Sequence, residues 1–173
     1  MNGFLNPTEV LKQIKLNKDM IAADFGCGSG GWVIPLAKIL EDGKVYAIDV
    51  LKEPLSVLKG KIHSESISNI EILESDVEIE NGLNIPDAVC DIVLMTNLLF
   101  ECEYKERVIR EASRTLKDKG KILVVDWTAN TIFGPKEGKV SAQEVKKIAK
   151  GIGLKLEKEF LAGNYHYALI FSK

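Results

Sequence analysis

Short, nearly continuous hydrophobic runs alternate with longer amphipathic stretches along this chain, which is typical of a protein built from strand–helix units. The runs at 21–25, 92–95 and 122–125 are almost entirely apolar, as expected for strands covered on both faces of a parallel sheet. Near the end of the chain, a short Gly163-Asn164 turn separates two further strand patterns and predicts an antiparallel hairpin. We expect strands at 21–25, 44–50, 69–73, 90–96, 121–126, 154–162 and 165–173.

Capping residues mark the ends of several predicted helices. Asn6 can cap a helix that begins at Pro7 and runs to about Leu16. A capping box at 141–144 opens another helix, which runs to Gly151. We expect the remaining helices at 32–40, about 54–61 and 102–120, the last of them closed by Gly120.

The order of these elements predicts an α/β fold with an open, doubly wound and mostly parallel sheet whose last strand is antiparallel. No linker, repeat or low-complexity tract interrupts the pattern, so we expect residues 1–173 to form one domain. Sheets of this kind bind ligands at the carboxyl ends of their strands, where the strand order reverses. Residues that follow strands are therefore the candidates for function.

Composition and charge exclude several classes of function. The chain has 173 residues, of which 46% are hydrophobic and 28% charged, so it is neither disordered nor fibrous. Its net charge of −2 gives no support to nucleic-acid binding. No apolar run is long enough to span a membrane, and the first residues lack the features of a signal peptide. The three cysteines are too scattered for disulfides or a metal site, and we expect a cytoplasmic protein without a metal.

A glycine-rich stretch directly after the first strand is the strongest motif. The sequence MIAADFGCGSGGWV, residues 20–33, matches G-x-G-x-x-G at Gly26, Gly28 and Gly31. It also matches D-x-G-x-G-x-G at Asp24, Gly26, Gly28 and Gly30. The first pattern suggests a dinucleotide, and the second suggests a different ligand. Both place an anion-binding helix terminus beside a flexible turn.

Three acids at strand ends help to choose between these ligands. Asp24 would repel a pyrophosphate but attract the ammonium or sulfonium group of S-adenosylmethionine (SAM). Asp49 ends the second strand and can accept both hydroxyls of a ribose, which SAM and NAD share. Asp76 follows the third strand and can contact an adenine, with Val77 packed on the ring. An acid ahead of the glycines therefore favours SAM over NAD.

Five segments spread over residues 20–127 resemble the class I SAM-dependent methyltransferases, of the small-molecule type that includes the ubiquinone/menaquinone-biosynthesis enzymes. The segments are ADFGCGSGG, KVYAIDV, ILESDVE, IPDAVCDIVLMTNLLFE and EASRTLKDKGKILVVDW. The resemblance implies a Rossmann-like sheet of seven strands in the order 3-2-1-4-5-7-6. It implies SAM as cofactor and a small-molecule acceptor rather than a macromolecule.

The resemblance also implies roles for single positions. Residues 24–30 would hold the methionine part of SAM, Asp49 the ribose, and residues 75–77 the adenine, while Asn97 would lie near the transferred methyl. The implied cofactor residues are Asp24, Gly26, Cys27, Gly28, Ser29, Gly30, Asp49, Val50, Ser75, Asp76, Val77 and Asn97.

Methyl transfer from a sulfonium needs a well-positioned nucleophile, and it needs a general base only if that nucleophile is protonated. The candidate catalytic residues are Asn97, Asp126 and His166, since each follows or begins a strand at the ligand edge. Asn97 is not followed by Pro-Pro-aromatic, so the N-P-P-Y arrangement of amine methyltransferases is absent.

The chain offers little to cover the acceptor. The helix at 7–16 is expected to pack beside the first strand as part of the core, leaving the acceptor pocket open to a large substrate or a homodimer partner. Two other functions stay open. One is a SAM-binding scaffold or regulatory subunit without chemistry of its own. The other is an NAD-dependent oxidoreductase, which the absence of a Tyr-x-x-x-Lys pair disfavours.

Overall fold

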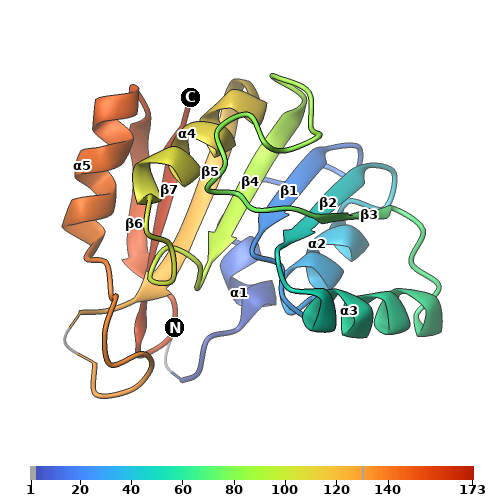
Figure 1. Ribbon diagram of the computed structural model, residues 1–173, viewed down its shortest axis with the longest axis horizontal. Helices are drawn as coiled ribbons and strands as arrows, with labels where there is room; N and C mark the ends of the chain where they lie inside the picture. The colour runs from blue at the N-terminus through green and yellow to red at the C-terminus, as the bar shows by residue number, and fades with distance from the viewer. Residues whose placement is uncertain (1–2, 130) are drawn as a thin grey trace.

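Seven strands form a single sheet through the middle of the protein, with helices on both of its faces (Figure 1). The computed structural model describes residues 3–129 and 131–173. The strand order is β3-β2-β1-β4-β5-β7-β6, and β7 is antiparallel to both of its neighbours while β1 to β5 run parallel. This confirms the order and direction that the family resemblance implies. The strands are β1 (Ile21–Phe25), β2 (Lys44–Asp49), β3 (Ile70–Glu74), β4 (Cys90–Thr96), β5 (Leu116–Trp127), β6 (Lys155–Leu161) and β7 (His166–Ser172).

Each face of the sheet has its own hydrophobic core. Alternate residues of each strand point to opposite faces, so Leu94 and Leu123 join one core, while Val93 and Val124 join the other. The first core is covered by α1 (Pro7–Leu11), α2 (Val33–Ile39) and α3 (Lys52–Ser64). The second is covered by α4 (Lys105–Thr115) and α5 (Ala142–Ile152).

The segment at 75–89 connects β3 to β4 without forming a helix, and the sequence analysis predicts none there. Leu83 and Ile85 are buried in the second core, where a helix would otherwise pack. The half-buried guanidinium of Arg114 on α4 donates to the Ile85 carbonyl at 2.9 Å and pairs with Glu111 at 2.6 Å. Packing and these polar contacts therefore replace regular backbone hydrogen bonding in the segment.

The boundary between α4 and β5 differs from the expectation of a helix to Gly120. The helix ends at Thr115, and β5 begins at Leu116, which pairs with Cys90 on β4. Backbone N–H groups of Ala88 and Val89 donate to the carbonyls of Arg114 and Thr115, and these bonds draw the chain into the sheet. A long-range pairing therefore overrides the local helical pattern.

The first helix is also shorter than expected, because α1 ends at Leu11 rather than near Leu16. Asn6 caps it as expected, accepting from the Glu9 N–H at 3.3 Å. Val10 and Leu11 are fully buried in the same core as α2. The helix therefore packs against the body of the sheet, as the sequence predicts. No helix among the described residues is long and apolar enough to cross a membrane.

Leu94 lies at the centre of the first core, on the strand that joins β1 to β5. Leu94→Ala should lower the free energy of unfolding by about 2–5 kcal/mol, because it removes buried methyl groups and leaves a cavity. Urea denaturation measures the change. Leu156→Ala on the exposed edge strand β6 is the matched control and should change stability by about 0.5 kcal/mol or less. Equal effects of the two substitutions would contradict this placement of the core.

Candidate functional site

The loop between β1 and α2 has a backbone that only glycine adopts easily. Gly26, Gly28 and Gly30 have φ values of 70°, 52° and 94°, all in the left-handed region. A Cβ on Gly26 would lie 2.8 Å from the Leu98 side chain, and one on Gly30 would lie 2.6 Å from that of Leu58. Gly31 has neither a positive φ nor a close neighbour. The glycines that the backbone requires are thus those of D-x-G-x-G-x-G, and the third glycine of the dinucleotide pattern is dispensable.

The end of β2 holds this loop in place. The N–H groups of Gly26 and Cys27 both donate to the Ile48 carbonyl at 2.9 Å. Asp49 accepts from the Gly28 N–H at 2.8 Å through one carboxylate oxygen and from the Leu51 N–H at 2.9 Å through the other. Each oxygen keeps a second lone pair for a ligand. Asp49 therefore shapes the glycine loop and can still accept hydrogen bonds from a ribose.

Asp24 is a fully buried carboxyl without a hydrogen-bond partner. It lies one residue before the end of β1, and neither of its oxygens meets a donor among the described residues. Burial, together with the negative charge of Asp49, raises the pKa of Asp24 to about 8. Leaving such a group unpaired is costly, and a cationic ligand at the glycine loop would offset that cost.

A cavity of about 450 Å³ lies at the carboxyl ends of β1 to β4, a size typical of small-molecule sites. It collects most of the residues that the sequence assigned to the cofactor. Asp24, Ser29 and Gly30 adjoin it in the chain but do not line it. The expected residues that do line it are Gly26, Cys27, Gly28, Asp49, Val50, Ser75, Asp76, Val77 and Asn97.

One side of this cavity is built from the turn that follows β3. The Ser75 N–H donates to the Asp49 carbonyl at 3.0 Å, which joins the ends of β3 and β2. Asp76 accepts from the Glu78 N–H at 2.8 Å and so fixes a tight turn. Val77 is buried beside it and offers an apolar surface. Val77 can thus pack against a flat apolar ring, and the Asp76 turn can contact the polar edge of that ring.

Sequence reasoning missed several lining residues on the far wall of the cavity. Leu98, Glu101 and Cys102 come from the turn after β4, and Thr96 ends that strand. Their position directly after a central strand is a signal that could have found them. Cys27 and Cys102 both line the cavity, and burial raises the pKa of both thiols, so they are protonated at neutral pH.

Asn97, the residue directly after β4, has an unusual backbone conformation. Its φ of 51° is unusual for a side chain other than glycine, and its N–H donates to the Val125 carbonyl at 2.8 Å. The side-chain oxygen is buried without a partner among the described residues. Strain of this kind persists where the surrounding structure enforces it, most often at binding or catalytic sites.

The structure does not bring Asp126 to the cavity. Its carboxylate accepts from the Trp127 N–H at 2.8 Å and the Phe100 N–H at 3.3 Å, and so ties the turn after β4 to β5. Burial raises its pKa to about 6, although these backbone hydrogen bonds oppose the rise. Its contacts are those of a group that positions the turn.

His166 lies on the opposite face of the sheet from Asp126. Asp126 pairs with Tyr167 across the β5–β7 ladder, and Trp127 pairs with His166, so neighbouring positions point to opposite faces. The His166 ring is buried 4.1 Å from the Trp127 ring, measured between centroids, and neither ring nitrogen meets a partner among the described residues. Burial lowers its pKa. Asp126 and His166 therefore cannot act as one acid–base pair.

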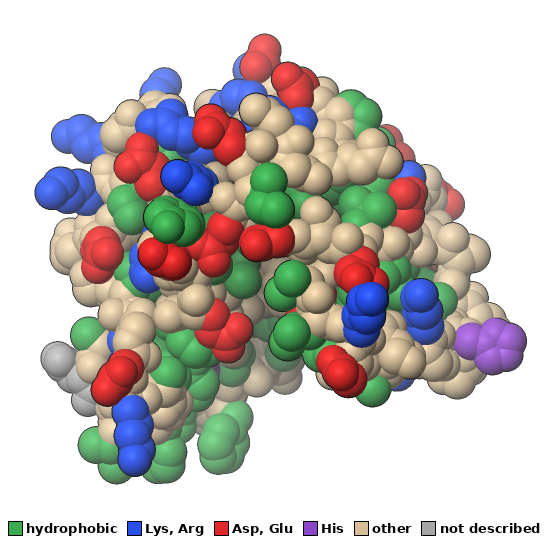
Figure 2. Space-filling view, in the orientation of Figure 1, with side chains coloured by type: hydrophobic (Ala, Val, Ile, Leu, Met, Phe, Trp, Pro, Cys, Tyr) green, Lys and Arg blue, Asp and Glu red, His purple; other side chains and the backbone are tan. Residues whose placement is uncertain are grey.

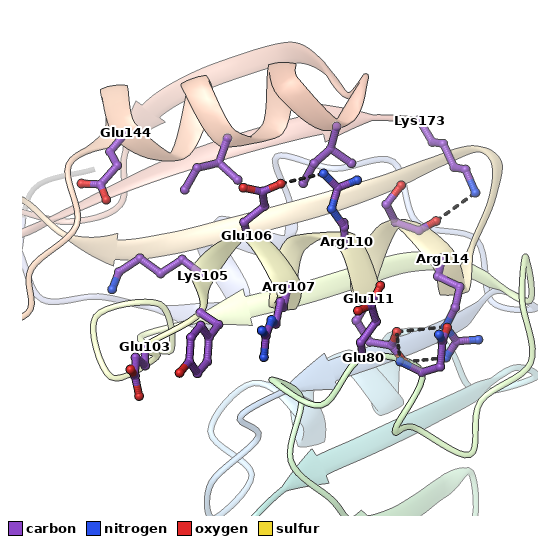
Figure 3. Close-up of a pocket in the computed structure, with 15 residues that line it drawn as sticks. Glu80, Glu103, Lys105, Glu106, Arg107, Arg110, Glu111, Arg114, Glu144 and Lys173 are labelled. Carbon is purple, nitrogen blue, oxygen red and sulfur yellow. Dashed lines mark hydrogen bonds and ion pairs between the residues drawn. The ribbon is translucent and has the colours of Figure 1, made fainter.

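A larger cavity of about 890 Å³ lies on the outer side of α4 and α5, away from the glycine loop (Figure 3). Its charged side chains neutralise one another. Arg110 pairs with Glu106 at 2.6 Å, while Lys173 donates to the carbonyls of Ser113 and Leu116 at 2.9 and 3.0 Å. None of the expected cofactor residues lines it. Among the described residues, no group of three or more His, Cys, Asp or Glu could hold a metal ion.

Comparison with known proteins identifies the family to which this chain belongs. A family model described as a methyltransferase domain matches residues 23–124. Demethylmenaquinone methyltransferase of Bacillus mycoides (strain KBAB4) is 27% identical over 135 residues, which are 76% of this chain and 55% of the relative. The enzyme of the same name from Geobacillus sp. (strain WCH70) is 27% identical over 129 residues, or 73% of this chain and 53% of the relative. The chain spans about half the length of these curated relatives.

Solved structures agree over nearly the whole chain. A SAM-dependent methyltransferase from Aquifex aeolicus superimposes with a TM-score of 0.88 and 29% identity, covering 97% of this chain and 89% of that one. The [4+2]-cyclase SpnF superimposes with a TM-score of 0.83 at 16% identity, covering 96% of this chain and 79% of that one, which is a likeness of fold alone. The family model covers more than half of the chain, and its match includes the glycine loop with its three left-handed glycines. The chain therefore belongs to the methyltransferase-domain family.

Proposed function

We propose that this chain transfers the methyl group of SAM to a small-molecule acceptor by in-line displacement. The observation that carries the proposal is Asp24, a fully buried carboxyl with no partner among the described residues, placed under a glycine loop. SAM has an ammonium group that can pair with this carboxyl. The pyrophosphate of NAD would instead be repelled. The names of the curated relatives, which act on demethylmenaquinone, support a small-molecule acceptor.

The residues around the cavity fit the parts of SAM in turn. Asp49 has free lone pairs for the two ribose hydroxyls, while its other lone pairs hold the loop. Val77 and the Asp76 turn fit an adenine. Close approach of the methionine part to the backbone is possible because Gly26 and Gly28 lack side chains there. When bound, SAM supplies a methyl group on a positively charged sulfur, which is already electrophilic.

The work left to the protein is to orient the acceptor and remove its proton. Asn97, directly after β4, can orient it through a side-chain oxygen that meets no partner among the described residues. We assign proton removal to His166, because its ring lies against Trp127 where β5 ends and β7 begins, and burial lowers its pKa, which favours the neutral form. Neither ring nitrogen meets a partner among the described residues, so the unprotonated nitrogen of the neutral ring can accept a proton. Asp126 is a positioning residue in this scheme.

One observation favours the alternative of a SAM-binding scaffold without chemistry of its own. Neither Asp126 nor His166 lines the cofactor cavity. The scaffold and the enzyme differ in a single experiment. With SAM labelled in its methyl group and demethylmenaquinone as acceptor, an enzyme yields labelled product, and a scaffold yields none while still binding the cofactor.

Cofactor identity gives a direct prediction. S-adenosylhomocysteine (SAH) should stabilise the folded protein by about 2.7 kcal/mol at a hundredfold excess over its dissociation constant, because it binds only the folded state. NAD should give no shift, since it has no ammonium group to pair with Asp24. Thermal unfolding with each ligand measures the effect. A shift with NAD and none with SAH would overturn the assignment.

The protonation of Asp24 predicts a pH dependence. Its pKa of about 8 in the ligand-free protein means that the carboxyl is mostly neutral at pH 6, whereas the ammonium of the cofactor needs it charged. Binding must then release a proton, so SAH affinity should rise with pH below about 8, at most roughly tenfold per unit. Titration calorimetry between about pH 5.5 and 7.5 measures this slope.

Two variants test that slope. Asp24→Asn should bind SAH more weakly and lose the slope, because it has no proton to release. Asp76→Asn is the matched control and should keep the slope. A slope that persists in Asp24→Asn would show that another group is responsible.

The role of His166 is separable from cofactor binding. His166→Asn should slow methyl transfer by roughly 10²–10⁴-fold if the acceptor needs a general base. Its affinity for SAH should stay unchanged, since the ring lies outside the cofactor cavity. His63→Asn, which alters the other histidine, exposed on α3, should leave the rate unchanged. A normal rate in His166→Asn would contradict the assignment.

A further inference from the structure

Four large hydrophobic side chains project into solvent from three segments that are far apart in the sequence. Phe4 is 87% exposed, Ile132 93%, Phe133 51% and Leu161 61%. Single exposed hydrophobic residues are ordinary, but a group of them marks a surface that binds something. We call these four residues the apolar tip.

Contacts around Tyr165 bring the three segments together. The Tyr165 ring lies 4.6 Å from the Phe133 ring and 6.4 Å from the Phe4 ring, measured between centroids. Gly3 and Asn164 exchange two hydrogen bonds, of 3.1 and 2.9 Å, which fix the N-terminal segment against the β6–β7 turn. Figure 2 shows hydrophobic side chains gathered at the lower edge of the protein, where these loops lie in Figure 1.

The apolar tip adjoins the edge at which the proposed acceptor binds. A Cβ on Gly134 would lie 2.5 Å from the Trp127 ring, so the loop that carries Ile132 and Phe133 lies directly over that ring. Trp127 in turn contacts His166. None of the four residues of the apolar tip lines the cofactor cavity. They therefore face outward beside the site instead of forming its wall.

Charge narrows the choice of partner. The segments that carry the apolar tip are 3–5, 131–138 and 161–165, and the charges of Lys136 and Glu137 within them cancel. Lys139 follows directly, and its ammonium is held by the Thr131 carbonyl at 2.7 Å, which leaves a single positive charge beside the apolar tip. A nearly neutral surface of this kind does not select a nucleic acid or a strongly charged protein. Attraction to it must come from its apolar area.

The exposed apolar area of the apolar tip helps to decide whether its partner is a second copy of the chain or a lipid surface. The four side chains expose on the order of 500 Å² of apolar surface. A stable dimer buries about 800 Å² on each partner, in a well-matched patch. Separate loop tips bearing Phe, Ile and Leu suit the boundary between lipid headgroups and acyl chains, where each side chain can be buried independently.

We propose that the apolar tip docks this protein on the surface of a lipid bilayer through neutral, apolar contacts. Phe4, Ile132, Phe133 and Leu161 enter the headgroup–acyl boundary, and the edge that holds Trp127 and His166 faces the bilayer. The evidence for docking is the exposure of these side chains, the charges of the segments that carry them and the apolar area that they present. Its purpose, to present the methyl-transfer site to the bilayer, rests on the proposed function.

Sedimentation with phosphatidylcholine vesicles tests the docking. The full chain should cosediment with vesicles of this uncharged lipid, and high salt should not release it. Phe4→Ser/Ile132→Ser removes the two most exposed members and should weaken binding roughly tenfold or more. Val57→Ser/Ile79→Ser alters side chains that are 51% and 56% exposed elsewhere on the surface, and it should bind as the wild type does.

Three outcomes would overturn the proposal. They are no binding by the wild type, an equal loss in both double variants, and binding that requires anionic lipid or is abolished by salt. Sedimentation equilibrium without lipid tests whether a second copy of the chain occupies this surface instead. If the protein is a dimer that Phe4→Ser/Ile132→Ser converts to a monomer, the surface serves self-association. SAH binding should be unchanged in both double variants. Failure of the wild type to bind SAH would defeat the proposed function but leave the vesicle result to decide the docking.

Discussion

The structure of this protein depends on how the chain leaves β1. Within three residues it must reverse into a left-handed path and attach to the neighbouring strand, which it does through two N–H bonds to Ile48 and one to Asp49. Only glycine permits this path at Gly26 and Gly28 without strain. The glycine wall of the cavity and the start of α2 depend on that single reversal.

Two carboxyl groups placed at one sheet edge give the ligand-free protein an electrostatic problem. Asp49 satisfies its charge with backbone donors, whereas Asp24 has none and is buried. A charged Asp24 without a cation beside it therefore raises the free energy of the folded protein. A ligand with a positive charge removes this cost, so the affinity of the site depends on the charge of the ligand. A site without that cost would bind a neutral adenosine equally well, and discrimination would be lost.

The sequence predicted the elements whose signals are local. Strands β1 and β4 are apolar because both faces are covered, and the glycines are dictated by steric limits at single positions. The end of α4 was mispredicted because Leu116 pairs with Cys90, a contact that no local pattern contains. Asp126 and His166 were grouped because both lie at strand ends, but side-chain alternation separates them by the thickness of the sheet. Leu98 and Cys102 were missed because their place in the cavity depends on the turn after β4.

The connection at 75–89 has a consequence for the dynamics of the site. It begins with residues that line the cofactor cavity, yet it has no helical or strand hydrogen bonding of its own. Backbone hydrogen bonds hold its two ends, while its middle is attached through the buried side chains of Leu83 and Ile85 and the guanidinium of Arg114. Such a segment can open in a sub-global fluctuation while the sheet stays intact. The wall that this segment contributes is thus the part of the cavity that can open first, and it offers a route for ligand exchange that leaves the glycine loop undisturbed.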